Sequence, residues 1–171
     1  MIWLPRIRFV LIFVLLGMAV LAQVRYGLTV AWSFYVGSGL LLLLHLFLGD
    51  VWVAFRQLQH GKFAQAQKLF DRTWWPDLLI PRNRAYYYLG TGIIALRQKD
   101  WAQAETRLLK ALALKLPRTN DRAIAQLNLA HLHYVQEQHD QAQEWLAAAQ
   151  AEQPTDLLVK EELAKLVAYY Q

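Results

Sequence analysis

Histidine, carboxylate and cysteine side chains are where this sequence could do chemistry, and few of them are spaced for it. The chain has 5 His, 13 Asp and Glu and no Cys, so it offers no thiolate ligand and no cysteine nucleophile. His131 and His133 are next-but-one neighbours. On a helix this spacing points the two rings about 200° apart, so they cannot share an ion as histidines one full turn apart do. We expect His133 to fill a packing position and predict no metal site.

No other catalytic pattern is present in the sequence. The apolar regions contain no paired carboxylates, and there is no Gly-rich phosphate loop and no Ser/His/Asp arrangement with supporting context. We therefore expect no enzymatic activity, no cofactor and no small-molecule substrate. The net charge of +5 and the pI of 9.6 are compatible with a nucleic-acid partner. However, the basic residues gather on one predicted face that points toward lipid, so we expect no nucleic-acid binding.

The N-terminal part of the chain is strongly apolar. Between residues 9 and 48 the only charged residue is Arg25. Residues 28–48 are long enough to cross a bilayer core of about 30 Å, and residues 9–24 are near the short limit. Basic residues lie before the first stretch and after the second, which favours a cytoplasmic location for both termini. The sequence predicts residues 1–48 as a two-helix transmembrane hairpin, in an integral membrane protein with two spans and both termini cytoplasmic, of the kind found in a bacterial inner membrane.

An alternative is that residues 1–22 form a cleaved signal peptide. Arg6 and Arg8 precede an apolar core that ends in small residues near Ala22, which is the pattern of a secretory signal. Cleavage there would leave only a handful of residues before the next apolar stretch, so the hairpin is the preferred interpretation.

The sequence after residue 50 repeats itself. The segments KFAQAQKLF, DWAQAETRL and QHDQAQEWL place three alanines at equal intervals, each followed one turn later by a large apolar residue. A small residue lets two antiparallel helices approach closely, and the large residue fills the space beside it. A period of this length indicates stacked helical hairpins. The alanines are Ala66, Ala104 and Ala142, and the large residues are Phe70, Leu108 and Leu146.

This pattern resembles the tetratricopeptide repeat over residues 50–154. The third copy has Leu129, Ala130, His133, Ala142, Leu146, Ala149 and Pro154 at the signature positions. The second has Tyr88, Gly92, Ala104, Leu108, Ala111 and, one residue late, Pro117, and the first has Gly61, Ala66 and Phe70. The interval between copies is a few residues longer than is usual in the family. The resemblance implies an all-α protein, in which a TPR-like α-solenoid of about 2.5–3 hairpins occupies residues 49–154.

Residues 155–171 are predicted to form a C-terminal capping helix. Val159, Leu163, Leu166, Val167 and Tyr170 fall on one face of a helix over residues 156–170, and charged residues fall on the other. Arrays of stacked hairpins need such a terminal element to cover the last apolar face.

The resemblance also implies a function in protein binding. In this family the first helices of successive hairpins line a concave groove, and the corresponding residues are Val51, Phe55, Leu58, Tyr86, Leu89, Ile93, Leu96, Leu127, His131 and Tyr134. None is Lys or Asn, so a clamp for a terminal carboxylate is not expected. An apolar groove suits an amphipathic helix of a protein partner, unless the loops or the C-terminal helix fill it.

We therefore expect a membrane-tethered protein–protein interaction module, an adaptor or assembly factor that presents its groove at the cytoplasmic membrane surface. The alternative is a permanent accessory or structural subunit of a membrane enzyme or transporter complex. In either case the expected partner is an amphipathic helix or a subunit of a membrane complex.

One apolar stretch with basic flanks, DRTWWPDLLIPRNR at residues 71–84, is unusual for a loop. Tryptophan pairs are typical of membrane interfaces, and basic residues bind anionic lipid. We predict a contact with membrane lipids through Trp74 and Trp75, with Arg72, Arg82, Arg84, Lys115 and Arg118 on the same side. Packing of this loop between hairpins, or against a partner subunit, are the alternatives.

Overall fold

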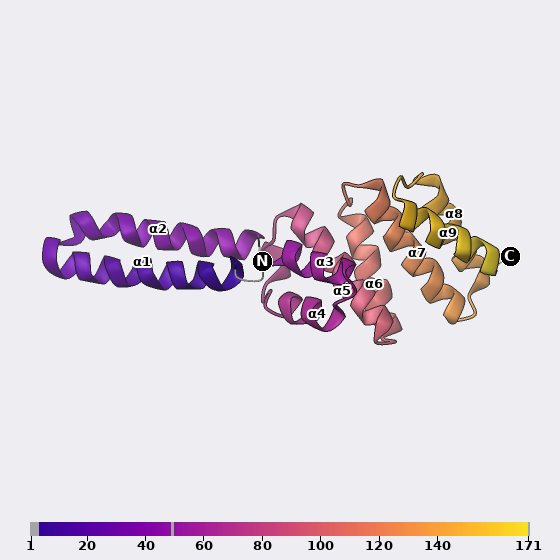
Figure 1. Ribbon diagram of the computed structural model, residues 1–171, viewed down its shortest axis with the longest axis horizontal. Coiled ribbons are helices and arrows are strands. Elements are labelled where there is room, and N and C mark those ends of the chain that lie inside the picture. Colours follow the sequence, from indigo (N-terminus) through magenta and orange to yellow (C-terminus); the bar gives the residue numbers. More distant parts are fainter. Residues whose placement is uncertain (1–3, 49, 171) are drawn as a thin grey trace.

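The computed structural model describes the backbone of residues 4–48 and 50–170, and the side chains of residues 10–44, 47 and 50–170. All regular elements in these ranges are helices, which confirms the all-α prediction. Figure 1 shows an elongated molecule, with a long two-helix hairpin at one end followed by a series of shorter hairpins.

The long hairpin consists of α1 (Leu4–Tyr26) and α2 (Leu28–Leu48), which lie side by side. Gly27 joins them with a φ of 81°, a left-handed conformation that glycine adopts without a steric penalty. The helices approach closely because small side chains lie between them, namely the fully buried Ala19 and Ala31 and the buried Ser38. The turn is at the predicted place.

The predicted membrane topology is not supported. Among the residues that the structure describes, no helix is at once long enough and apolar enough to cross a membrane. A crossing needs about 20 consecutive apolar residues. The prediction of an integral membrane protein with two spans and both termini cytoplasmic, in a bacterial inner membrane, is therefore wrong.

Three short helical hairpins follow in chain order. They pair α3 (Val51–Gln59) with α4 (Phe63–Phe70), α5 (Pro81–Arg97) with α6 (Trp101–Ala113), and α7 (Thr119–Val135) with α8 (His139–Ala151). Each hairpin also contacts the next one, through α3 with α5 and α6 with α7. We call residues 51–151 the hairpin array. The predicted bend at Gly49 lies outside the described residues.

The period of the sequence is also a period of the structure. The second and third hairpins have helices of equal length, because α5 and α7 both have 17 residues and α6 and α8 both have 13. Their starting residues are separated by the same interval as Ala104 and Ala142. The turns within the hairpins repeat in the same way, because Gly61, Lys99 and Glu137 have φ values of 71°, 62° and 63°. The second and third hairpins therefore share one backbone pattern, whereas the first, with helices of 9 and 8 residues, shares only the turn.

Small residues let the helices of a hairpin pack closely. Ala66, Ala104 and Ala142 are buried, as predicted. The contact at Gly90 is tighter, because a Cβ atom built there would overlap Cζ of Phe70 and lie 2.7 Å from its Cε2. Such a distance is far below van der Waals contact, so α5 passes against the Phe70 ring only because residue 90 has no side chain.

Asp100 caps the second helix of its hairpin, whereas Asp140, which stands near the start of the next second helix, does not. The Asp100 carboxylate accepts a hydrogen bond of 3.1 Å from the backbone N–H of Gln103, which satisfies a free donor in the first turn. α8 begins one residue before Asp140, after Gln138, and has no side-chain cap. Asp140 is therefore already inside the helix and cannot cap it.

The C-terminal helix α9 (Leu157–Tyr170) packs on α7 and α8. Val159 is buried, and the predicted apolar face joins it in a small core with α7 and α8 through Leu163, Leu166, Val167 and Tyr170. The start of α9 is tied to α7, because the Asn120 Oδ1 accepts hydrogen bonds from the backbone N–H groups of Thr155 and Asp156 at 2.7 Å and 3.2 Å.

Candidate functional site

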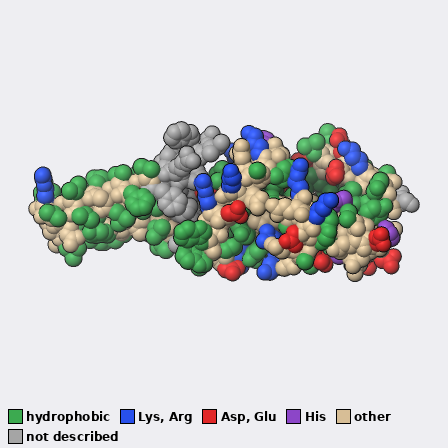
Figure 2. All heavy atoms as spheres, turned by 90° about the horizontal axis from the view of Figure 1, so that it is seen from below, with side chains coloured by type: hydrophobic (Ala, Val, Ile, Leu, Met, Phe, Trp, Pro, Cys, Tyr) green, Lys and Arg blue, Asp and Glu red, His purple; other side chains and the backbone are tan. Residues whose placement is uncertain are grey.

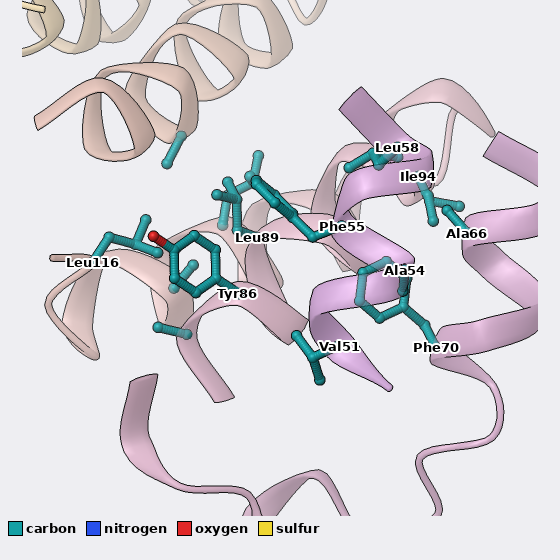
Figure 3. Packing of buried hydrophobic residues seen from close by; sticks show 14 of the residues in the cluster. Val51, Ala54, Phe55, Leu58, Ala66, Phe70, Tyr86, Leu89, Ile94 and Leu116 are labelled. Carbon is teal, nitrogen blue, oxygen red and sulfur yellow. The ribbon is translucent and has the colours of Figure 1, made fainter. Parts of the chain in front are cut away.

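Most of the predicted groove residues lie inside the hairpin array. The largest group of them forms one core between α3 and α5. Figure 3 shows Tyr86 and Leu89 of α5 beside Phe55 of α3. The ring centroids of Phe55 and Tyr86 are 5.1 Å apart, and the rings meet edge to face. The buried members of the predicted groove are Val51, Phe55, Leu58, Tyr86, Leu89, Leu96 and Leu127.

Tyr86 connects the second hairpin to the third. Its phenol donates a hydrogen bond of 2.5 Å to Oδ2 of Asp121, in the first turn of α7. Both side chains are buried. Burial, followed by the hydrogen bond with Asp121, raises the pKa of the Tyr86 phenol far above its usual value. This phenol therefore stays protonated and acts as a donor that fixes α7 against α5.

The third-copy groove residues are in contact with the C-terminal helix. The rings of Tyr134 and Tyr170 are stacked, with centroids 3.9 Å apart and an interplanar angle of 13°. His131 Nδ1 lies 3.2 Å from the Tyr170 hydroxyl. Burial, with smaller contributions from Tyr134 and Tyr169, raises the pKa of Tyr170 to about 12. At this end the predicted groove is occupied by the chain's own helix.

Only three of the predicted groove residues remain accessible. Ile93 and Tyr134 are half-buried and His131 is exposed. Sequence reasoning missed Trp52, an exposed residue of α3 whose ring is 5.1 Å from that of Tyr86 and lies 5.4 Å from the Arg82 guanidinium carbon. The signal available in the sequence was that Trp52 directly follows Val51, the first of the predicted groove residues.

The two histidines have different partners. His133 is buried, and its Nδ1 lies 2.6 Å from Oε1 of Gln138. Its other ring nitrogen faces Glu105 at 3.8 Å. His131 instead meets Tyr170. No group of three or more metal-ligating side chains occurs in the described part of the chain.

The Trp loop, residues 71–80, is exposed on the outside of the array. Trp74 is 80% exposed and Trp75 is 57% exposed, and their rings meet edge to face. The loop is held at its end, where Leu79 is buried in the main core and the backbone N–H of Ile80 donates to the carbonyl of Phe47 at 3.0 Å. The two indoles therefore do not pack between hairpins.

Internal contacts give the Trp loop a defined shape. A short 3₁₀ turn, η1 (Pro76–Leu78), follows the two tryptophans. The carbonyl of Asp77 accepts a hydrogen bond of 3.3 Å from the Arg84 guanidinium, and its carboxylate accepts one of 3.4 Å from the Tyr88 hydroxyl. α5 therefore holds the Trp loop in place through Asp77, and the two indoles remain exposed.

The predicted basic residues fall into two groups. Arg72 and Arg82 are exposed and lie on either side of the two tryptophans in the sequence, and Arg84 is half-buried. Lys115 and Arg118 are exposed in the connection between α6 and α7. Figure 1 shows that this connection lies farther from the long hairpin than the Trp loop does. Arg72, Arg82 and Arg84 are therefore close to the tryptophans along the chain, and Lys115 and Arg118 lie on a separate connection.

Comparison of the chain with family models, with curated proteins and with solved structures finds no match. The tetratricopeptide resemblance therefore stays a prediction from the repeat itself.

Proposed function

We propose that this chain is a protein-interaction module, an adaptor or assembly factor built on a tetratricopeptide-like solenoid. The observation that carries the proposal is that the helices of the second hairpin recur in the third, and that all three hairpins have a left-handed turn residue at one constant interval. An array of similar hairpins in which each contacts its neighbours offers an extended surface to a partner. The first helices α3, α5 and α7 contact one another in that order, as the groove-forming helices of such a solenoid do.

The partner is an amphipathic helix that lies along α5 and α7 beside α9. The face that remains accessible there has Ile93 half-buried and His131 exposed, while Tyr134 is covered on one side by Tyr170. α9 supports this choice, because it is itself an amphipathic helix seated on α7 through Val159 and Tyr170. In helix-in-groove binding, the partner helix makes its contacts through apolar residues three and four positions apart.

Site-specific photo-crosslinking in the native cell tests this proposal. A photoreactive residue at His131 should crosslink one protein reproducibly, whereas one at Glu144, exposed on α8, should not. The variant Ile93→Asn should then reduce the His131 crosslink at least several-fold while the melting temperature changes little. The proposal fails if both positions crosslink the same mixture, or if Ile93→Asn has no effect on the His131 crosslink.

A second candidate function, that of a permanent accessory subunit of a larger enzyme or transporter complex, is favoured by the long hairpin. Many of its described large hydrophobic side chains are exposed, among them Phe13, Val24 and Trp32, and Figure 2 shows hydrophobic side chains along the visible face of the hairpin. Exposed apolar surface of this extent needs a cover. Purification from native cells separates the two functions, because a subunit should co-purify one to one and an adaptor should be sub-stoichiometric.

A further inference from the structure

The Trp loop has the composition of a surface that meets lipid headgroups. Trp74 and Trp75 are exposed, and so are Leu78 and Ile80 farther along the loop. An indole combines a large apolar ring with one N–H donor, so it is stable where an apolar layer meets water. Because the loop is fixed to α5 and to the main core, these side chains are held outward in a defined arrangement.

The charges around the loop select an anionic surface. Arg72 precedes the two tryptophans and Arg82 follows them, and both are exposed. The acidic residues nearby are Asp71, which is exposed, and Asp77, whose carboxylate accepts a hydrogen bond from Tyr88. A guanidinium group can donate two parallel hydrogen bonds to the oxygens of one phosphate. Arg72 and Arg82, on either side of the two tryptophans, therefore complement phosphate headgroups.

The end of the Trp loop lies against the end of the long hairpin. The hydrogen bond from Ile80 to the Phe47 carbonyl places the end of the loop against the C-terminal turn of α2. Phe47 is itself exposed, as are Leu43 and Leu44 one turn earlier. Exposed apolar side chains therefore lie at both ends of this hydrogen bond.

We propose that the Trp loop is a docking surface for anionic lipid, in which the Trp74 and Trp75 rings enter the headgroup layer and Arg72 and Arg82 bind lipid phosphates. This surface is separate from the proposed helix-binding face on α5 and α7. The two proposals therefore succeed or fail independently.

Spin labelling of the full chain tests the proposal, and the absence of Cys makes a single label possible. The variant Trp74→Cys carries a nitroxide, and collisions with a water-soluble nickel complex report its exposure. Mixing with vesicles of phosphatidylcholine and phosphatidylglycerol should lower the collision rate several-fold. The matched control is Val135→Cys, at an apolar residue that is 45% exposed at the end of α7, and its label should not respond.

Charge variants supply the second arm. In a chain labelled at residue 74, the double substitution Arg72→Gln and Arg82→Gln should restore most of the collisions between the nitroxide and the nickel complex when the mixed vesicles are present. Lys160→Gln with Lys165→Gln removes the same charge from exposed positions on α9 and should leave the protection intact. Circular dichroism confirms that each variant has the parent's helical content.

Three results would overturn the proposal. One is a residue 74 label that stays as accessible as the residue 135 label when vesicles are present. Another is equal protection in the arginine and lysine variants. The third is protection that appears without vesicles and grows with protein concentration, since the loop would then be covered by a second copy of the chain.

Discussion

Tyr86 and Asp121 belong to different hairpins and are joined by a buried hydrogen bond of 2.5 Å. This contact ties the second hairpin to the third. Tyr86→Phe keeps the ring but leaves the buried Asp121 Oδ2 without its donor, and an acceptor in that state costs about 1–3 kcal/mol. Thermal unfolding followed by circular dichroism should show a clear loss of stability.

The control for this change is Tyr88→Phe. Tyr88 is half-buried and makes a longer bond, 3.4 Å, to Asp77, so its loss should cost well below the Tyr86 value. Equal effects of the two substitutions would show that the Asp121 contact contributes nothing particular.

Alkaline pH should destabilise the fold through its buried tyrosines. The pKa of Tyr170 is raised to about 12 by burial first and by Tyr134 next, and the pKa of Tyr86 is raised further by burial and Asp121. The folded state holds these protons more tightly than the unfolded state, whose tyrosines ionise near pH 10. The stabilisation is therefore complete below about pH 10 and is lost as the pH rises toward the folded values. Urea unfolding at several pH values should show this loss, and Tyr170→Phe should reduce it.

Gly90 should tolerate no larger residue. Gly90→Ala places a Cβ atom in overlap with the Phe70 ring, and the resulting strain should cost about 1–3 kcal/mol. Replacing the Phe70 ring by the smaller side chain in Phe70→Leu should recover part of this loss. The double variant should then be more stable than the sum of the two single losses predicts. Gly39→Ala is the control, because nothing lies within 4 Å of its Cβ position. Additive melting temperatures for Gly90→Ala and Phe70→Leu would contradict the contact.

The hairpin turns offer a way to stabilise the array. Lys99 and Glu137 adopt left-handed conformations at the positions where the first hairpin has Gly61. The left-handed conformation costs a residue other than glycine about 1–2 kcal/mol of folding free energy. Substitution by glycine removes this cost, but part of the gain is lost because glycine has more conformational entropy in the unfolded chain. Lys99→Gly and Glu137→Gly should each stabilise the fold by about 0.5–1 kcal/mol in urea unfolding. Gly61→Ala, the reverse change, should destabilise it.

The repeat made the backbone predictable from the sequence, because Ala66, Ala104 and Ala142 mark equivalent helix contacts within each hairpin. The cap at Asp100 is of the same local kind, because it depends only on residues within one helical turn. Local reasoning could not predict how far one hairpin rotates against the next. That rotation depends on close contacts such as Gly90 with Phe70 and Tyr86 with Asp121, whose partners lie on different hairpins.

The errors at the site follow from this missing rotation. Leu89 and Phe55 were predicted to face an open groove, and both are buried in the core between α3 and α5. The predicted capping helix was found, but its Tyr170 lies on Tyr134 and closes the same groove at its other end. The exposure of Trp74 agrees with a surface role, since its ring meets only that of Trp75 among the described aromatic contacts.

The equal spacing of the helices makes the second and third hairpins alike in backbone but not in the side chains at their junction. Residues 81–118 and residues 119–156 carry helices with the same bounds relative to their start. At the positions equivalent to Tyr86 and Asp121, however, the other unit has Ile124 and Asn83. Duplicating either unit in the gene would therefore lengthen the array by one hairpin of the same backbone length, and the new junction would lack the buried hydrogen bond between a phenol and a carboxylate.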